Sequence, residues 1–203
     1  SQFALHNGIN SLKLGDTVCM SFADNKPIPV AGTFGAMLTD DDIVYDRMRH
    51  LRKNGKATRE EQFTMPGYSS HPDEQFAVAI LASWKHFEKW QRRRIEIGAV
   101  YDDAFAGKVN TRPSPSYSTW NGHKYAILVE DKFKTYNDLL AQGIQTEKHY
   151  VDNFSTLDFT PRYDKDFAMS DLFVQQSLTL PNNPHMTDQE IEKVIDQVLF
   201  SCT

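Results

Sequence analysis

Residues 17–39 read TVCMSFADNKPIPVAGTFGAMLT, and this stretch decides the fold. Its beginning, Thr17 to Ala23, is apolar and rich in β-prone residues, which predicts a buried strand. Residues 24–33 contain two prolines and a glycine and therefore predict a loop, whereas Phe34 to Thr39 predicts a second short strand. The stretch indicates a strand, a loop that carries Lys26, and a returning strand.

Helical patterns follow this hairpin. Thr39, with Asp42 three residues later, resembles a helix cap, and we expect a helix from there to about Asn54, closed by Gly55. Residues 56–72 are polar and predict a long loop. Apolar residues at helical spacing then predict one long helix over about 73–105, which we expect to bridge two domains.

After an expected linker at 107–119, the last part of the chain contains apolar residues at both helical and strand spacing. Thr187 and Glu190 form a capping box, which predicts the start of a final helix. Strands and helices in this order indicate the tail of an α/β unit followed by an α+β unit. The other elements expected here are a strand at His123–Glu130, a helix from Phe133 to Gly143, a strand at Ile144–Tyr150 and a helix at 166–177.

The composition is that of a globular protein, with 40% hydrophobic and 24% charged residues among 203. The formal net charge of -5 argues against bulk nucleic-acid binding, which usually needs a basic excess. We expect neither a membrane span nor a signal peptide. Cys19 and Cys202 lie far apart with no CxxC motif, so we expect a reducing compartment, the cytoplasm.

Lys26 is the first candidate for chemistry. An amine in a loop directly after a buried strand can be desolvated, which suits covalent chemistry with a carbonyl group. Ser21, five residues earlier, can donate a hydrogen bond to a phosphate. Taken singly, each has a more common role: a solvated surface charge for the lysine, and a hydroxyl bonded to the backbone for the serine.

Two further segments offer weaker signals. Residues 67–71, Gly-Tyr-Ser-Ser-His, combine a glycine with hydroxyls and an imidazole, which suits an anion cradle, although a plain polar loop explains them too. The acidic run Asp40 to Asp42 is better explained as a helix cap than as a metal site. His149 and His185 have no second ligand at metal spacing, so we predict no metal site.

Together, the ordered motifs of this chain resemble the DegT/DnrJ/EryC1 family of sugar aminotransferases. The central motif is the Ser-Phe pair at Ser21, three residues, the lysine Lys26, and then a glycine-rich turn with a strand that ends in Thr39. The other matching motifs are Gly15-Asp16, Gly67-Tyr68, Asp73-Glu74 with Ala77, Arg94 and Tyr101, Gly143-Ile144 with His149-Tyr150, and Leu178 to Pro181 before Pro184 and Thr187.

The resemblance implies the C-terminal portion of a fold-type-I pyridoxal 5'-phosphate (PLP) enzyme. Residues 1–106 would be the end of the large α/β domain with the linking helix, and 107–203 the small α+β domain. The implied reaction moves an amino group from an amino acid, usually glutamate, to a nucleotide-linked keto sugar. The implied assembly is a homodimer with the active site at the subunit interface.

The resemblance also assigns roles to residues. Lys26 would carry PLP and move a proton between the substrate carbon and the cofactor. Ser21 would bind the PLP phosphate, and Gln2 would contact the cofactor ring oxygen. Ser69 takes the place of an Asn that reaches the phosphate in the partner subunit. His71 and His149 would lie on the substrate side.

The chain departs from the family pattern at several positions. Ser69 instead of Asn shortens the phosphate contact, and His71 instead of Arg makes the charge there pH-dependent. Phe34 and Pro72 also replace the residues that the family prefers. We expect these changes to affect the substrate range more than the use of the cofactor.

The family's N-terminal half is not matched by these residues. The Asp that pairs with the pyridine nitrogen would precede Ser1, so we expect the 203 residues alone to be inactive and to need that half on the same or a separate chain. Two alternatives remain. Related PLP proteins dehydrate sugars but carry His at the lysine position, against which Lys26 argues. The other alternative is a non-catalytic remnant or interaction module of the same fold.

Overall fold

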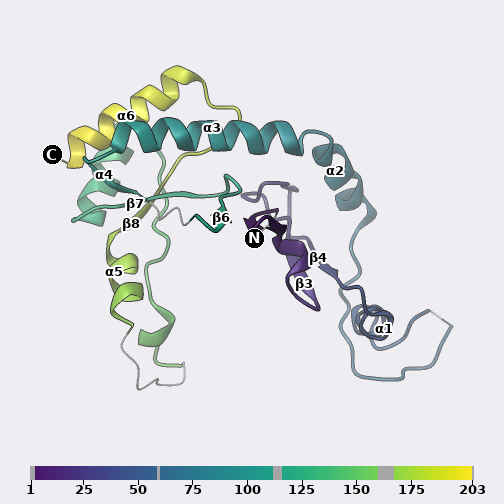
Figure 1. Cartoon of the computed structure of the whole chain (residues 1–203). Coiled ribbons are helices and arrows are strands. Elements are labelled where there is room, and N and C mark those ends of the chain that lie inside the picture. The colour runs from purple at the N-terminus through teal and green to yellow at the C-terminus, as the bar shows by residue number, and fades with distance from the viewer. Residues whose placement is uncertain (1–2, 59, 112–115, 160–166, 203) are drawn as a thin grey trace. The chain divides into compact units, whose positions relative to one another are not determined.

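The computed structural model describes residues 3–58, 60–111, 116–159 and 167–202, which fall into two compact units (Figure 1). The first unit comprises Ser1–Gln91 with Pro115–Asn121, and the second comprises Arg92–Ser114 with Gly122–Thr203. Helix α3 (Phe87–Phe105) begins in the first unit and ends in the second. Within the described ranges, no helix has both the length and the apolar character needed to cross a bilayer.

The predicted hairpin forms in the first unit. Strands β3 (Val18–Ser21) and β4 (Gly35–Leu38) pair antiparallel, and Met20 lies opposite Ala36. These two side chains lie on the same face of the hairpin, as directly opposite residues of paired strands do, and both pack in the core of the unit. The prediction of strand, loop and strand is confirmed. The buried core cluster consists of Met20, Phe22, Ile28, Val30 and Phe87.

Helix α1 (Asp42–Arg52) starts at a different cap from the one predicted. The side chain of Asp41, not Thr39, accepts hydrogen bonds from the N–H groups of Ile43 (2.8 Å) and Val44 (3.1 Å). Thr39 instead accepts from the Asp41 N–H at 3.2 Å and so holds the capping residue in place. The middle residue of the acidic run is therefore a helix cap, as its composition indicated.

Short elements that the sequence pattern did not predict complete the first unit. A three-stranded antiparallel sheet has the order β2 (Ile9–Asn10), β1 (Leu5–His6) and β6 (Ser118–Thr119). A 3₁₀ turn, η1 (Ser11–Lys13), follows β2. Strands of two residues are too short to show an alternating pattern, which is why they were missed.

The expected long helix over 73–105 is wrong, because it is two helices, α2 (Glu74–Trp84) and α3, separated at Lys85–His86 (Figure 1). The His86 N–H bonds to the Ser83 carbonyl at 3.0 Å in a tighter turn. The ring of Phe3 packs against both Trp84 (5.5 Å between centroids) and Phe87 (4.6 Å) at this break. The spacing of apolar residues over 73–105 cannot predict a contact with a residue as distant in the sequence as Phe3.

The second unit is built on a three-stranded antiparallel sheet of order β5 (Asn110–Thr111), β7 (Tyr125–Leu128) and β8 (Ser177–Leu180). Helix α5 (Ala168–Gln176) leads directly into β8, and a 3₁₀ turn, η2 (Phe154–Thr156), lies between α4 (Lys132–Ala141) and α5 in the chain. The fully buried core side chains include Ile97, Tyr101, Phe105, Tyr125, Ile127, Leu139, Leu178 and Val198.

Helix α4 (Lys132–Ala141) ends in a Schellman motif that explains a second wrong prediction. Gly143 has φ +74°, and the Ile144 N–H bonds back to the Leu139 carbonyl at 2.9 Å. Ile144 therefore belongs to the helix cap. Only Glu147 pairs with β8, through an isolated bridge to Thr179, so the expected strand over Ile144–Tyr150 does not form.

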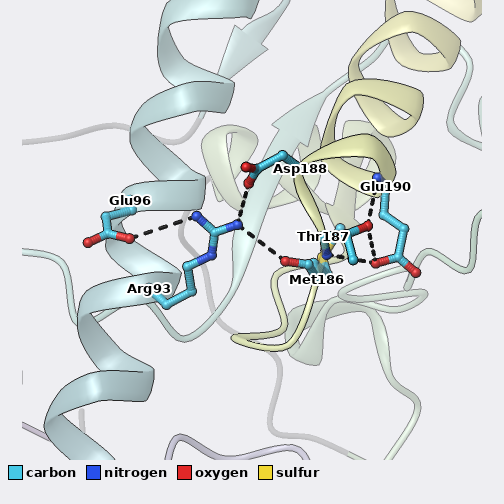
Figure 2. A network of polar contacts seen from close by, with 6 residues as sticks. All are labelled: Arg93, Glu96, Met186, Thr187, Asp188 and Glu190. Atoms are coloured by element: carbon cyan, nitrogen blue, oxygen red, sulfur yellow. Dashed lines mark hydrogen bonds and ion pairs between the residues drawn. The ribbon is translucent and has the colours of Figure 1, made fainter.

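The capping box at the start of helix α6 (Asp188–Cys202) is confirmed. The Glu190 N–H donates to Thr187 Oγ1 at 3.2 Å, and the Thr187 N–H donates to Glu190 Oε2 at 2.8 Å. Figure 2 shows how Arg93 of α3 bonds to the same turn, through Asp188 (2.6 Å) and the Met186 carbonyl (3.2 Å). Because Asp188 is largely exposed, this ion pair contributes about 1 kcal/mol or less and mainly fixes where α6 begins.

The buried hydroxyl of Tyr101 gives a test of this core. It donates to the Pro181 carbonyl at 2.9 Å, and the side chain has no exposed surface. We expect Tyr101→Phe to lower the free energy of unfolding by about 1–2 kcal/mol, because the carbonyl loses its partner in a dry environment. Chemical denaturation measures the change, and Tyr45→Phe at an exposed site on α1 should leave stability unchanged; equal stability of both variants would contradict the assignment.

Candidate active site

Lys26 lies in a turn directly after β3. Its own N–H donates to the Ala23 carbonyl at 2.9 Å, and the Ala23 N–H donates to Ser21 Oγ at 3.4 Å. Ala23 thus connects the serine hydroxyl and the lysine backbone through two hydrogen bonds. The two residues that the sequence singled out first are held on one short segment.

This segment is anchored on both sides by the core. Phe22 donates to the Phe34 carbonyl and accepts from the Val30 N–H, both at 2.9 Å. Pro27 and Ile28, which follow the lysine, are fully buried. Lys26 itself is half-buried, while Ser21 is exposed. The backbone around the amine is therefore fixed, while the serine side chain lies at the surface of the unit.

Gly32 closes the loop against helix α2. Its φ is +146°, and a Cβ added there would lie 2.8 Å from the ring of Phe76. Only glycine permits both this backbone angle and this close approach. The glycine of the predicted loop thus has a packing role, which holds the loop that carries Lys26 onto α2.

Ser69 and His71 lie on a second loop, whose backbone caps the C-terminal end of α1. The Tyr68 N–H donates to the Leu51 carbonyl (2.7 Å), and the Ser70 N–H donates to the Arg52 carbonyl (3.1 Å). Ser69 forms an isolated bridge with Lys53. These bonds satisfy carbonyls that the end of a helix leaves without partners, so the loop and the helix end form one rigid piece.

Two glycines allow the loop that carries Ser69 to approach the end of α1 closely. Gly55 has φ +87° and donates to the His50 carbonyl at 2.8 Å, as predicted for the residue that ends α1. A Cβ on Gly67 would lie 2.1 Å from the Gly55 nitrogen. Ser69 and His71 remain exposed on this loop, and His71 Nδ1 lies 3.4 Å from the Pro72 carbonyl oxygen.

His149 belongs to the second unit and sits in a polar network there. Its Nδ1 lies 3.0 Å from Thr179 Oγ1, and its Nε2 lies 3.3 Å from Glu147 Oε2. Lys124 Nζ donates to the same Glu147 oxygen. The hydrogen bond from Lys124 is the main influence on Glu147 and lowers its pKa; burial opposes this, and the nearby charges of Lys124, His149 and His123 lower the pKa further.

A buried lysine, which the sequence pattern did not single out, supports the segment that carries His149. Lys132 is 3% exposed, and its amine donates to the carbonyls of Tyr150 (3.1 Å) and Val174. Burial lowers the pKa of this amine, and the charge of Lys148 lowers it further. Lys132 thereby fixes the position of the residue next to His149.

The predicted site residues therefore fall into separate groups. Ser21 and Lys26 share one loop, Ser69 and His71 share another, and both loops lie in the first unit. His149 lies in the second unit, and Gln2 lies outside the described residues. In the described ranges, no group of three His, Cys, Asp or Glu side chains could hold a metal ion.

Sequence reasoning missed Lys124, Glu147 and Thr179, which surround His149. One local signal was present: Glu147 and His149 are two residues apart in a segment expected to be extended, which places both on the same side. Thr179 comes from a strand that pairs with this segment only in the folded chain. No local pattern contains that contact.

Comparison with known proteins shows the family to which the chain belongs. The profile of the DegT/DnrJ/EryC1/StrS aminotransferase family matches residues 4–199. The chain belongs to this family. The family resemblance that the ordered motifs indicated is confirmed.

The dTDP-3-amino-3,4,6-trideoxy-alpha-D-glucose transaminase of Streptomyces venezuelae is 28% identical over 189 residues, which cover 88% of this chain and 48% of that protein. A DegT DnrJ EryC1 StrS aminotransferase from Brucella abortus has the same fold, with a TM-score of 0.92, 21% identity, and coverage of 100% of this chain and 55% of that one. The Streptococcus pneumoniae protein Spr1654, solved in its PLP form, has a TM-score of 0.86 at 20% identity, and the match covers 100% of this chain and 55% of that one.

The fold is thus that of the C-terminal portion of a DegT/DnrJ/EryC1/StrS aminotransferase, as predicted. The chain spans about half the length of the curated relatives it matches.

The contact between Gly67 and Gly55 gives a test of the loop that carries Ser69. We expect Gly67→Ala to lower the free energy of unfolding by about 1–3 kcal/mol, because the added methyl group meets backbone atoms that cannot move aside. Urea denaturation followed by fluorescence measures the change. In Gly15→Ala the nearest atom, the Thr17 carbonyl oxygen, is 3.3 Å away and needs to move by only a few tenths of an ångström, so this control should cost much less than Gly67→Ala; equal costs for the two variants would show that the loop does not pack as described.

The Glu147 network predicts a pH-dependent effect. The lowered pKa of Glu147 means that this carboxylate stabilises the fold above its ordinary value of 4.5 and that the contribution disappears as the pH falls through the folded pKa. We expect Lys124→Met to cost less than about 1 kcal/mol at pH 7, since both side chains are partly exposed.

This difference should shrink as Glu147 is protonated below pH 4.5. Denaturation curves at neutral and acid pH measure it. Lys193→Met on the exposed side of α6 is the control and should show no difference at either pH. A Lys124 effect of the same size at pH 7 and at pH 3 would contradict the ion pair.

Proposed function

We propose that this chain is the C-terminal part of an enzyme that uses PLP to transfer an amino group from an amino acid, with glutamate as the expected donor, to a nucleotide-linked keto sugar. Membership of the family supports the reaction class, and the dTDP-linked sugar in the name of the Streptomyces relative supports the substrate class. The observation that carries the proposal is the turn after β3, which holds Lys26 five residues past Ser21 on a backbone anchored in the core.

The residues of this turn fit PLP by their chemistry. A bound PLP supplies a carbonyl that an amine can attack and a ring that withdraws electrons from the substrate. Lys26 contributes a primary amine, and Ser21 contributes a hydroxyl that can donate to a phosphate oxygen. Both side chains come from the segment around Ala23, so one short stretch supplies a covalent anchor and a phosphate donor.

Lys26 would hold the cofactor and, once displaced by the substrate, would move a proton at Nζ. Ser21 would orient the phosphate, and the fixed backbone between the two residues would set their separation. Ser69 would reach the phosphate in a partner subunit, which is why we expect a homodimer. Gln2 would contact the ring oxygen, and His71 and His149 would lie on the substrate side.

The same proposal assigns the two parts of the chain to two domains. Residues 1–106 would form the end of the large domain with its linking helix, and 107–203 the small domain. The half of the relatives that this chain does not match would supply the acidic partner of the ring nitrogen, on the same chain or a separate one. We expect the protein to act in the cytoplasm, where the free thiols of Cys19 and Cys202 stay reduced.

The half-length coverage favours one alternative, a non-catalytic remnant or interaction module of the same fold. The two candidates differ in a simple measurement. With PLP added to the protein in its full-length form, an enzyme develops the visible absorption of cofactor bound to a lysine. A remnant stays colourless.

Borohydride reduction in the presence of PLP tests the role of Lys26. We expect mass mapping of the full-length protein to place a phosphopyridoxyl group on this lysine, because its amine follows the phosphate donor on the same turn. Lys26→Arg keeps the charge but cannot form the bond, so it should abolish labelling. Lys13→Ala, an exposed lysine of the same unit, should label as the unsubstituted protein does; labelling elsewhere would refute the assignment.

A further inference from the structure

Lys132 is the only charged side chain that is buried within the described ranges, with 3% of it exposed. Removing an ammonium group from water is costly unless its hydrogens find acceptors. Here the amine donates to the backbone carbonyls of Tyr150, at 3.1 Å, and Val174. A methionine of similar length would fill the same space without the cost of desolvating a charge. The amine therefore indicates a role in holding these two carbonyls.

The two carbonyls belong to the two parts of the chain that surround His149. Tyr150 follows the histidine directly, and its ring lies edge-on to the imidazole with 5.3 Å between centroids. Val174 is in the last turn of α5, where a helix leaves its carbonyls without intrahelical partners. Helix α5 leads into β8, which carries Thr179, the residue that contacts His149 Nδ1. Lys132 thus connects the segment of His149 with the helix that precedes its hydrogen-bond partner.

The partners of the His149 ring define which nitrogen carries the proton. Nε2 lies 3.3 Å from Glu147 Oε2, and an ionised carboxylate can only accept, so Nε2 carries the hydrogen. In a neutral imidazole the other nitrogen is then an acceptor, so the Thr179 hydroxyl donates to Nδ1 at 3.0 Å. A ring turned over by 180° would bring carbon atoms to both positions and lose both contacts. The orientation of the ring is therefore specific.

The edge of His149 that faces Glu147 is a hydrogen-bond donor beside a second donor. His149 Nε2 and Lys124 Nζ both approach the same oxygen of Glu147. The carboxylate side chain is 49% exposed, so this group of charges lies partly at the surface. Two donors that converge on one oxygen suit a negatively charged oxygen of a ligand as well. His149 can offer this edge to a substrate only while Nε2 stays beside Lys124.

We propose that Lys132 is a positioning residue for His149: by holding the Tyr150 carbonyl and the end of α5, it keeps the Nε2 edge of the imidazole beside Lys124. This inference rests on the proposed function, in which His149 lies on the substrate side. It goes further because it assigns the orientation of that ring to a buried residue of another helix. A loosened segment would let the ring turn and would weaken substrate binding, even where Lys26 and its loop are unchanged.

Carbethoxylation by diethyl pyrocarbonate measures this orientation, because the reagent needs an open lone pair on an imidazole nitrogen. In the full-length protein at neutral pH, His149 should react at least about tenfold more slowly than the exposed His185, since both of its nitrogens are engaged. Lys132→Met should speed the reaction of His149 at least about fivefold and leave that of His185 unchanged. Mass mapping gives the rate at each histidine. An unchanged rate at His149 overturns the proposal.

Two matched variants separate positioning from a general loss of stability. Lys132→Arg keeps the charge and its donors, so it should hold the slow rate of His149 within about twofold. Leu139→Ala opens a cavity at a fully buried position of the same helix and should also leave that rate within about twofold. Equal acceleration by Leu139→Ala and Lys132→Met overturns the proposal. If Lys132→Met does not fold, Lys132→Gln, which keeps a donor without the charge, replaces it with the same expected direction.

Binding of dTDP, the probe for the nucleotide part of the substrate, tests the proposed function separately. Calorimetry on the full-length protein should show a dissociation constant at least about tenfold higher for Lys132→Met and for His149→Ala. The double variant should show no further rise, because both changes remove the same contact; additive effects overturn the proposal. If His149→Ala leaves the dissociation constant unchanged, the substrate-side role of His149 fails, while the carbethoxylation rates still decide whether Lys132 orients the ring.

Discussion

The burial of Phe22, Ile28 and Val30 is the constraint on which the candidate site depends. These side chains root the loop after β3 in the core, and the bonds from Phe22 to Phe34 and from Val30 to Phe22 close it. An amine on an unanchored loop would sample many positions, and the cost of ordering it would fall on each binding event. Here the loop becomes ordered when the unit folds, so Lys26 lies on a backbone that is already fixed before a ligand binds.

Much of this arrangement could be predicted because the decisive interactions are local. The apolar, β-prone composition of residues 17–23 and the prolines after Lys26 predict a strand and a loop, and Thr187 with Glu190 predicts the start of α6. Gly55 and Gly143 predict helix ends because the left-handed backbone found there suits glycine. Each of these features depends on residues within a few positions of one another.

The features that were missed depend on distant residues. Phe3 packs at the break between α2 and α3, and Thr179 pairs with Glu147 and bonds to His149. The cap of α1 shows a subtler limit, since Thr39 and Asp41 are both good capping residues and only the backbone decides between them. The residue types limit which helix caps and contacts can form, and the packing of the folded chain decides which of them do form.

The loop that caps α1 determines where the chain can change in length among related proteins. Gly55 accepts from the Thr64 N–H and hydroxyl, and Tyr68 bonds to both Leu51 and Asn54, so the chain is clamped on either side of residues 56–63. Closing a longer excursion between fixed ends adds little entropic cost. Insertions or deletions there can accumulate without displacing Ser69, which leaves the length of this surface excursion open to evolutionary change.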